Sequence, residues 1–101
     1  LKPLRLVLGE IVIDKNSHQV KVRDEDIELT ATEFKLLILL TERMGRVQSR
    51  DALLKDVWGY AGDLDTRTVD THVQRLRSKL LDSGKCIITA RGFGYKFVSE
   101  N

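Results

Sequence analysis

The hydrophobic period changes once along the chain, near residue 30, and this change constrains the fold more than any other feature. Before it, short aliphatic and β-branched runs at 4–8, 11–13, 20–22 and 27–29 alternate with turn formers at 9–10, 14–17 and 23–26. This spacing is typical of an antiparallel meander. After it, apolar residues recur at intervals of three and four, which indicates helices. We therefore expect an α+β chain that begins with a four-stranded antiparallel sheet over residues 1–29.

Two helices are predicted next, as the first part of a three-helix core over residues 31–82. Thr30 and Glu33 have the spacing of a capping box, which predicts a helix over 31–44 that ends at Gly45. A short extended link at 47–48 follows. Ser49 can then cap a second helix over roughly 50–58.

The third helix, predicted over about 67–82 and closed by Ser83-Gly84, carries the clearest periodicity. Its apolar residues Val69, Val73, Leu76 and Leu80 fall at i, i+4, i+7 and i+11, so one face should be buried. The opposite face is expected to hold Thr68, Thr71, His72, Arg75, Ser78 and Lys79, with Arg67, Gln74 and Arg77 at its flanks.

The chain ends with two β runs, 86–91 and 95–98, joined at Gly92-Phe93-Gly94, where glycine permits a tight turn. A hairpin over 86–98 is therefore predicted directly after the third helix. The order of sheet, three helices and hairpin is that of a winged helix-turn-helix domain covering residues 1–101.

Composition excludes several other classes. With 101 residues, 42% of them apolar, one domain can build a core without a metal or a disulfide. The single cysteine, Cys86, and two scattered histidines lack zinc-ligand spacing, and no apolar run is long enough to cross a bilayer. The sequence shows no pattern typical of a catalytic triad. It also lacks a phosphate-binding loop, because the G-x-G of the last turn is not followed by a helix. We therefore expect that the chain is not an enzyme, binds neither a metal nor a cofactor, and does not contact a membrane.

Charge is distributed unevenly. Residues 66–99 carry seven Lys or Arg and two Asp or Glu, whereas residues 1–65 carry ten and twelve. A basic third on a slightly acidic body is the electrostatic pattern of a polyanion-binding protein. An ordinary solvated face gives the same pattern, so charge alone leaves both interpretations open.

The outward face of the third helix offers the side chains that read DNA. Arginine can donate two hydrogen bonds to guanine, and glutamine can form two with adenine. Arg67 and Arg77 could instead pair with Asp70 on the flank. Two alternatives are a protein-docking helix, which usually exposes leucines or aromatics, and an RNA-binding surface, for which only Phe93 and Tyr95 could stack on bases.

Four segments resemble the OmpR/PhoB family, the winged-helix effector domains of bacterial two-component response regulators. They are the string over 67–80, the hairpin segment 88–97, the first-helix motif at 29–37 and Val57-Trp58-Gly59. Their order and register match the family over nearly the whole chain. Thr71 and Gln74 depart from the family pattern, so the base preference is not carried over from the family.

The resemblance implies roles for individual residues and for partners. The resemblance implies DNA contacts at Arg67, Thr68, His72, Arg75 and Arg77 on the helix, at Thr89, Arg91 and Tyr95 on the wing, and at Trp58. The outward face of the third helix adds Thr71, Gln74 and Lys79 to the expected DNA-contacting positions. The loop expected to contact RNA polymerase comprises Gly59, Tyr60, Ala61, Gly62, Asp63, Leu64 and Asp65. The resemblance also implies tandem binding to direct repeats with a second copy of the chain, in bacterial cytoplasm. The chain is expected to be the C-terminal part of a protein whose receiver domain, controlled by a sensor kinase, precedes it.

Overall fold

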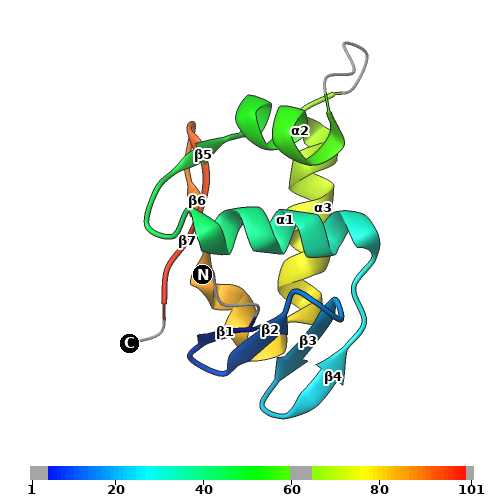
Figure 1. Cartoon of the computed structure of the whole chain (residues 1–101). Helices are drawn as coiled ribbons and strands as arrows, with labels where there is room; N and C mark the ends of the chain where they lie inside the picture. The colour runs from blue at the N-terminus through cyan, green and yellow to red at the C-terminus, as the bar shows by residue number, and fades with distance from the viewer. Residues whose placement is uncertain (1–4, 60–64, 100–101) are drawn as a thin grey trace.

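The computed structural model describes residues 5–59 and 65–99, and it has the predicted architecture of two sheets around a helical core (Figure 1). The elements in chain order are β1 (Arg5–Leu8), β2 (Ile11–Asp14), β3 (Gln19–Val22), β4 (Glu25–Ile27), α1 (Ala31–Glu42), β5 (Gln48–Ser49), α2 (Arg50–Trp58), α3 (Arg67–Lys79), a 3₁₀ helix (Leu81–Cys86), β6 (Ile87–Ala90) and β7 (Gly94–Phe97). The α+β winged-helix prediction is confirmed.

The N-terminal sheet is a four-stranded antiparallel meander in the order β1-β2-β3-β4. The last strand was predicted at 27–29 but lies at Glu25–Ile27, because the turn before it is shorter than the predicted 23–26. Arg23 and Asp24 both have positive φ, 52° and 66°, and form a two-residue hairpin turn with the twist such hairpins favour. The strand therefore starts at Glu25, and Ile27 pairs with Val20.

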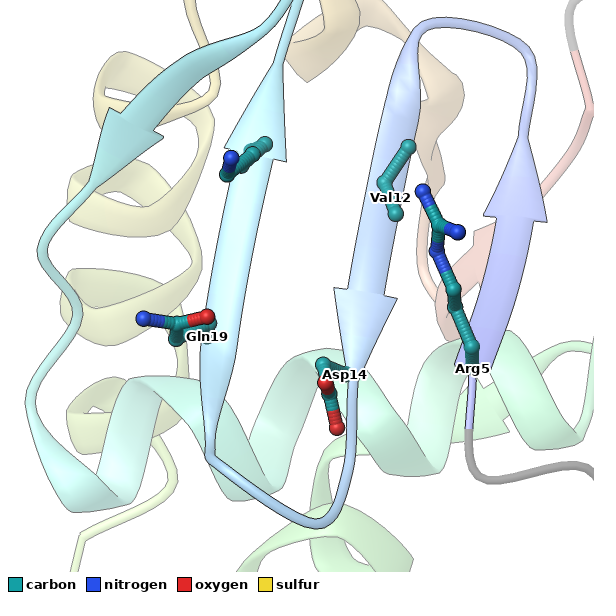
Figure 2. A pocket seen from close by; sticks show the side chains of 5 residues that line it. Arg5, Val12, Asp14 and Gln19 are labelled. Atoms are coloured by element: carbon teal, nitrogen blue, oxygen red, sulfur yellow. The ribbon is translucent and has the colours of Figure 1, made fainter.

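The two faces of this sheet differ because side chains alternate along each strand. Ile11 and Ile13 point toward the helices and are fully buried. The outer face instead carries the shallow hollow of Figure 2, lined by Arg5, Val12, Asp14, Gln19 and Lys21 from β1, β2 and β3. The sheet thus packs on the helical core with one face and exposes the other face to solvent.

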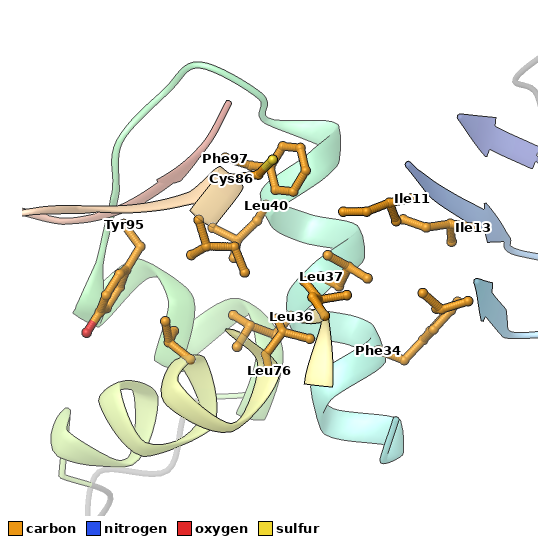
Figure 3. Packing of buried hydrophobic residues seen from close by; sticks show 14 of the residues in the cluster. Ile11, Ile13, Phe34, Leu36, Leu37, Leu40, Leu76, Cys86, Tyr95 and Phe97 are labelled. Atoms are coloured by element: carbon orange, nitrogen blue, oxygen red, sulfur yellow. The ribbon is translucent and has the colours of Figure 1, made fainter. Parts of the chain in front are cut away.

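Helix α1 lies at the centre of the core, between the N-terminal sheet and the C-terminal strands (Figure 3). The capping box is confirmed, since the Thr30 hydroxyl accepts from the amide of Glu33 and Glu33 accepts from the amide of Thr30. Leu36, Leu37 and Leu40 are fully buried. The helix ends at Glu42, two residues before the predicted end.

Helix α2 begins and ends as predicted, and the Ser49 hydroxyl accepts from the amide of Ala52. Helix α3 is shorter than the predicted 67–82 and ends at Lys79. Leu81 takes a positive φ of 57° and starts the 3₁₀ helix. Gly84, expected to stop α3, instead packs against it: a Cβ there would lie 2.3 Å from the carbonyl oxygen of Arg77.

The wing is a three-stranded sheet in the order β5-β7-β6, and the predicted hairpin forms two of its strands. The link that begins at Val47 was extended as expected, but its pairing with β7 was not predicted. Gly94 permits this pairing, because it has a φ of 150° and a Cβ would lie 1.9 Å from the carbonyl oxygen of Gln48. The wing is therefore joined to the segment that leads into α2.

Candidate nucleic-acid interface

Helix α3 buries the stripe predicted from its period. Val69, Val73, Leu76 and Leu80 have no exposed surface, so the opposite side of the helix must face solvent. The exposed residues along it are Arg67, Thr71, Gln74, Arg75 and Ser78, which we call the α3 strip. The strip carries two arginines and no carboxylate.

The α3 strip is rotated relative to the predicted face. Thr68 and His72 were expected to point outward, but both are half-buried. The His72 ring lies edge-on to the ring of Trp58, with centroids 4.9 Å apart, and its Nδ1 is 2.8 Å from the carbonyl oxygen of Thr68. Ser78, which periodicity also placed outward, lies on the strip. The side of α3 that carries His72 therefore packs against Trp58 of α2 and is not free to face solvent.

Arg67 and Asp65 form a local ion pair at the start of α3. The two guanidinium bonds to Asp65 Oδ2 are 2.9 and 2.7 Å long, and Asp65 Oδ1 accepts from the amide of Arg67 at 2.9 Å. These bonds hold the pKa of Asp65 below its usual value. Asp65, and not the alternative partner Asp70, orients Arg67 at the exposed end of the strip.

Lys79 points toward α1. Its Nζ donates to Glu33 Oε1 at 2.6 Å, and the Glu33 side chain is only 2% exposed. Burial raises the pKa of Glu33, but the hydrogen bonds from Lys79 and from the Thr30 amide together lower it below its usual value. Lys79 thus neutralises a buried carboxylate that periodicity could not pair with it across 46 residues.

Arg77 contacts both strands of the wing hairpin. Its Nε and Nη2 donate to the carbonyl oxygen of Ile87 at 3.0 and 2.8 Å, and Nη2 also donates to the Thr89 hydroxyl at 2.6 Å. The guanidinium carbon lies 5.5 Å from the centre of the Tyr95 ring. Pairing with Asp70, the alternative to a DNA contact for Arg77, is therefore replaced by hydrogen bonds to Ile87 and Thr89.

Tyr95 and Asp70 form a second contact between α3 and the wing. Tyr95 is 5% exposed, and its hydroxyl donates to Asp70 Oδ1 at 2.5 Å. The same oxygen lies 3.0 Å from Nε of Arg50, the first residue of α2. Burial and the neighbouring Asp70 raise the pKa of Tyr95. Tyr95 therefore joins the wing to α3 and α2 instead of presenting its hydroxyl to solvent.

The turn of the wing is exposed. Arg91 lies in it, and Phe93 is 76% exposed while its amide closes the turn on the carbonyl oxygen of Ala90 at 2.8 Å. Phe93 also lines a surface hollow with Ser49 and Thr66, so the turn lies near the starts of α2 and α3. A cation and an aromatic side chain are thus available beside the N-terminal end of the α3 strip.

The structure describes the two ends of the predicted polymerase loop. Its residues Tyr60, Ala61, Gly62, Asp63 and Leu64 lie outside the described residues, so only its ends can be placed. Gly59 ends α2 with a φ of 75°, and Asp65 pairs with Arg67.

Other kinds of site find no support in the described part of the chain. Within residues 5–59 and 65–99, no three His, Cys, Asp or Glu side chains are grouped as metal ligands are. In the same ranges, every helix is too short or too polar to cross a membrane.

The helix-turn-helix, the cationic α3 strip and the attached hairpin define a winged-helix domain of the kind that binds nucleic acid. The family model described as "Transcriptional regulatory protein, C terminal" matches residues 24–97. The chain belongs to this family, the OmpR/PhoB-type DNA-binding domains of transcriptional response regulators. The predicted resemblance is confirmed.

Curated relatives extend well beyond this sequence. The chain is 50% identical over 92 residues to the transcriptional regulatory protein VxrB of Vibrio cholerae, covering 91% of this chain and 37% of VxrB. It is 44% identical over 94 residues to the DNA-binding response regulator MtrA of Mycolicibacterium smegmatis, covering 90% of this chain and 41% of MtrA. The chain thus spans about two fifths of the length of these relatives.

Solved structures agree with the fold. The DNA-binding domain of Klebsiella pneumoniae RstA, in complex with the RstA box, superposes with a TM-score of 0.83 at 37% identity over 93% of this chain and 96% of that one. The DNA-binding domain of CpxR from E. coli gives a TM-score of 0.83 at 34% identity over 99% of this chain and 100% of that one. One of these similar domains was therefore solved on DNA.

Proposed function

We propose that this chain binds double-stranded DNA in a sequence-specific manner as the output domain of a two-component response regulator, and that it is a binding domain without catalytic activity. The α3 strip is the observation that carries the proposal. It is exposed, cationic and free of carboxylates, and it lies on a helix whose other sides pack on α1, α2 and the wing. A helix fits the major groove, where all four base pairs can be distinguished.

Base reading falls to Arg75, Gln74 and Thr71 in this proposal. Arg75 and Gln74 can each form two hydrogen bonds with a purine edge, and Thr71 can contact a thymine methyl group. Arg67, at the start of the strip, and Arg91, in the wing turn, supply charge for the backbone. Phosphate contacts at the edge of the groove are proposed for three half-buried residues at α2 and the facing side of α3, namely Thr68, His72 and Trp58.

Salt dependence and one substitution test the proposal. If about four phosphates are neutralised, the logarithm of the binding constant falls with the logarithm of salt concentration at a slope of about −3 to −4. Arg75→Ala should weaken binding by about 1–3 kcal/mol and remove the preference at one base position in a randomised-site selection. Arg46→Ala, at an exposed position after α1, is the matched control. A slope near zero, or an unchanged site preference in Arg75→Ala, contradicts the proposal.

The two alternative functions have less support. A protein-docking helix needs an apolar exposed face, whereas the α3 strip has neither a leucine nor an aromatic residue. An RNA-binding surface needs several stacking aromatics, yet Tyr95 is buried and only Phe93 of the two candidates is exposed. Binding of single-stranded RNA more tightly than duplex DNA of the same sequence is the result that would favour the second alternative.

The proposal extends to the whole protein through its relatives. The chain spans about two fifths of the length of these relatives. We propose that the whole protein also contains a receiver domain, which a sensor kinase controls, and that the protein is located in the bacterial cytoplasm. On DNA, two copies are proposed to bind direct repeats head to tail. A probe with two half-sites should then bind more tightly than the sum of its halves, and loss of this gain when one half-site is inverted supports tandem binding.

The loop from Gly59 to Asp65 is proposed to contact RNA polymerase. The resemblance to the family supports this role, and the loop follows directly after α2 in the chain. Tyr60→Ala or Leu64→Ala should abolish a bacterial two-hybrid signal with polymerase subunits while DNA affinity is kept. Unchanged transcription activation in both variants contradicts the contact.

A further inference from the structure

Arg77 belongs by sequence to the basic face of α3, but its contacts lie within the protein. Its three hydrogen bonds, two to Ile87 and one to Thr89, come from the Nε and Nη2 atoms on one edge of the guanidinium. The Tyr95 ring lies against the same guanidinium, 5.5 Å from its carbon to the ring centre. One side chain of α3 thus holds β6 by hydrogen bonds and β7 by ring contact.

A second attachment lies two helical turns away. The Tyr95 hydroxyl donates to Asp70, which Arg50 of α2 also contacts. Positions 70 and 77 are separated by roughly 10 Å along the helix axis, because each residue adds about 1.5 Å. The pairing of β5 with β7 already joins the wing to the segment before α2. The two separated contacts with α3 add to this pairing and set the angle between the wing and the helix.

This angle matters for DNA binding. The α3 strip and the exposed wing turn must reach neighbouring grooves together, and a wing free to move would have to be ordered at each binding event. Ordering a segment on binding reduces affinity, whereas a segment already held in place avoids that loss.

We propose that Arg77 is a positioning residue that fixes the wing against α3, and that it does not contact DNA itself. This rests on the proposed function, because the wing is assumed to touch the duplex. The inference separates Arg77 from Arg75, which lies only two residues away on the same helix but is exposed.

Arg77→Lys distinguishes positioning from phosphate contact. Lysine keeps the charge but cannot form the planar fork or stack on the ring as arginine does. If Arg77 positions the wing, hydroxyl-radical footprints of Arg77→Lys lose protection under the wing and keep it under α3. If Arg77 contacts phosphate, lysine preserves the footprint and the salt slope, and the proposal is overturned.

A double-mutant cycle with Arg91 in the wing turn sharpens the test. Arg91→Ala should weaken binding about tenfold in the parent but less than about twofold in Arg77→Lys, because the wing contact is already lost. Arg75→Ala should cost the same in both backgrounds. Equal losses for Arg91→Ala in both backgrounds overturn the proposal.

Two further measurements separate a displaced wing from a general loss of stability. Ile13→Val, in the buried face of the N-terminal sheet, lowers stability far from the wing and should leave the footprint unchanged. In the free domain, NMR relaxation of the amides of 87–97 should show a wing that moves relative to α3 in Arg77→Lys but not in the parent. If the parent binds no DNA, the proposed function fails, whereas this measurement still tests the wing's attachment. An unchanged wing there overturns the positioning role.

Discussion

Replacing Lys79 with alanine tests whether this cation stabilises the fold or contacts DNA. Glu33 is 2% exposed, and within residues 5–59 and 65–99 the bond with the Thr30 amide, 2.9 Å long, is the one left to its side chain once Lys79 is removed. Breaking a buried ion pair costs about 3–5 kcal/mol, and losing a charged hydrogen bond costs about 1.5–3 kcal/mol. Because the Lys79 side chain is 38% exposed and water screens it, the lower range applies, and we expect a loss of about 2 kcal/mol.

Urea unfolding followed by far-UV circular dichroism measures this loss, which corresponds to a fall of roughly 8–10 °C in Tm for a domain of this size. Glu33→Gln in the Lys79→Ala background should recover part of it, because the unpaired buried charge is removed. Lys35→Ala, at an exposed position of α1, should change stability by less than about 0.5 kcal/mol.

DNA titrations at several salt concentrations complete the test. In our interpretation Lys79→Ala lowers the free energy of unfolding and leaves the salt slope unchanged. If stability is instead unaltered while the slope falls in magnitude by about one, Lys79 neutralises a phosphate and the reasoning from the ion pair is wrong.

Three other perturbations follow from the structure. The pKa of Glu33 is lower in the folded protein than in the unfolded chain. The ionised Glu33 side chain therefore stabilises the fold near neutral pH, and this stabilisation is lost as pH falls through the folded pKa. Urea unfolding at several acidic pH values should show stability falling less steeply in Glu33→Gln than in the parent. Gly94→Ala should cost about 2–6 kcal/mol through backbone strain and the clash with Gln48, against about 1 kcal/mol for Gly92→Ala, where a Cβ meets nothing within 4 Å; thermal melts compare the two. Leu76→Ala, at a fully buried position of α3, should cost about 2–5 kcal/mol in urea unfolding.

The sequence predicted best those features that depend on local chemistry. The capping box at Thr30 and the hydroxyl cap at Ser49 form as expected, since each needs only residues three positions apart. The buried stripe of α3 is also confirmed, because a helix of known period fixes which side chains share a face. Boundaries were less accurate where a non-glycine residue adopts positive φ, as at Asp24 and Leu81, because composition does not announce this conformation.

The candidate site was predicted less completely than the fold, since its missing parts are contacts between distant segments. A helical wheel marks Lys79 and Arg77 as outward cations, but it contains neither Glu33 on α1 nor the carbonyl oxygen of Ile87. The pairing of β5 with β7 was missed for the same reason, because two residues carry no period. For the contact between Lys79 and Glu33, the sequence did contain one signal. Glu33 is an acidic side chain on the first buried turn of α1, and a buried charge requires a partner.

These contacts narrow the surface with which one domain can read DNA. With Asp70 and Arg77 bound to the wing, Lys79 to α1 and His72 to α2, the α3 strip from Arg67 to Ser78 is what remains exposed along the helix. Eleven residue steps span roughly 16 Å, which corresponds to about five base pairs at roughly 3.4 Å each. A randomised-site selection with one domain should therefore specify no more than about five consecutive positions under α3. A longer contiguous site would mean that α3 rotates on DNA and frees the flanking cations from their partners.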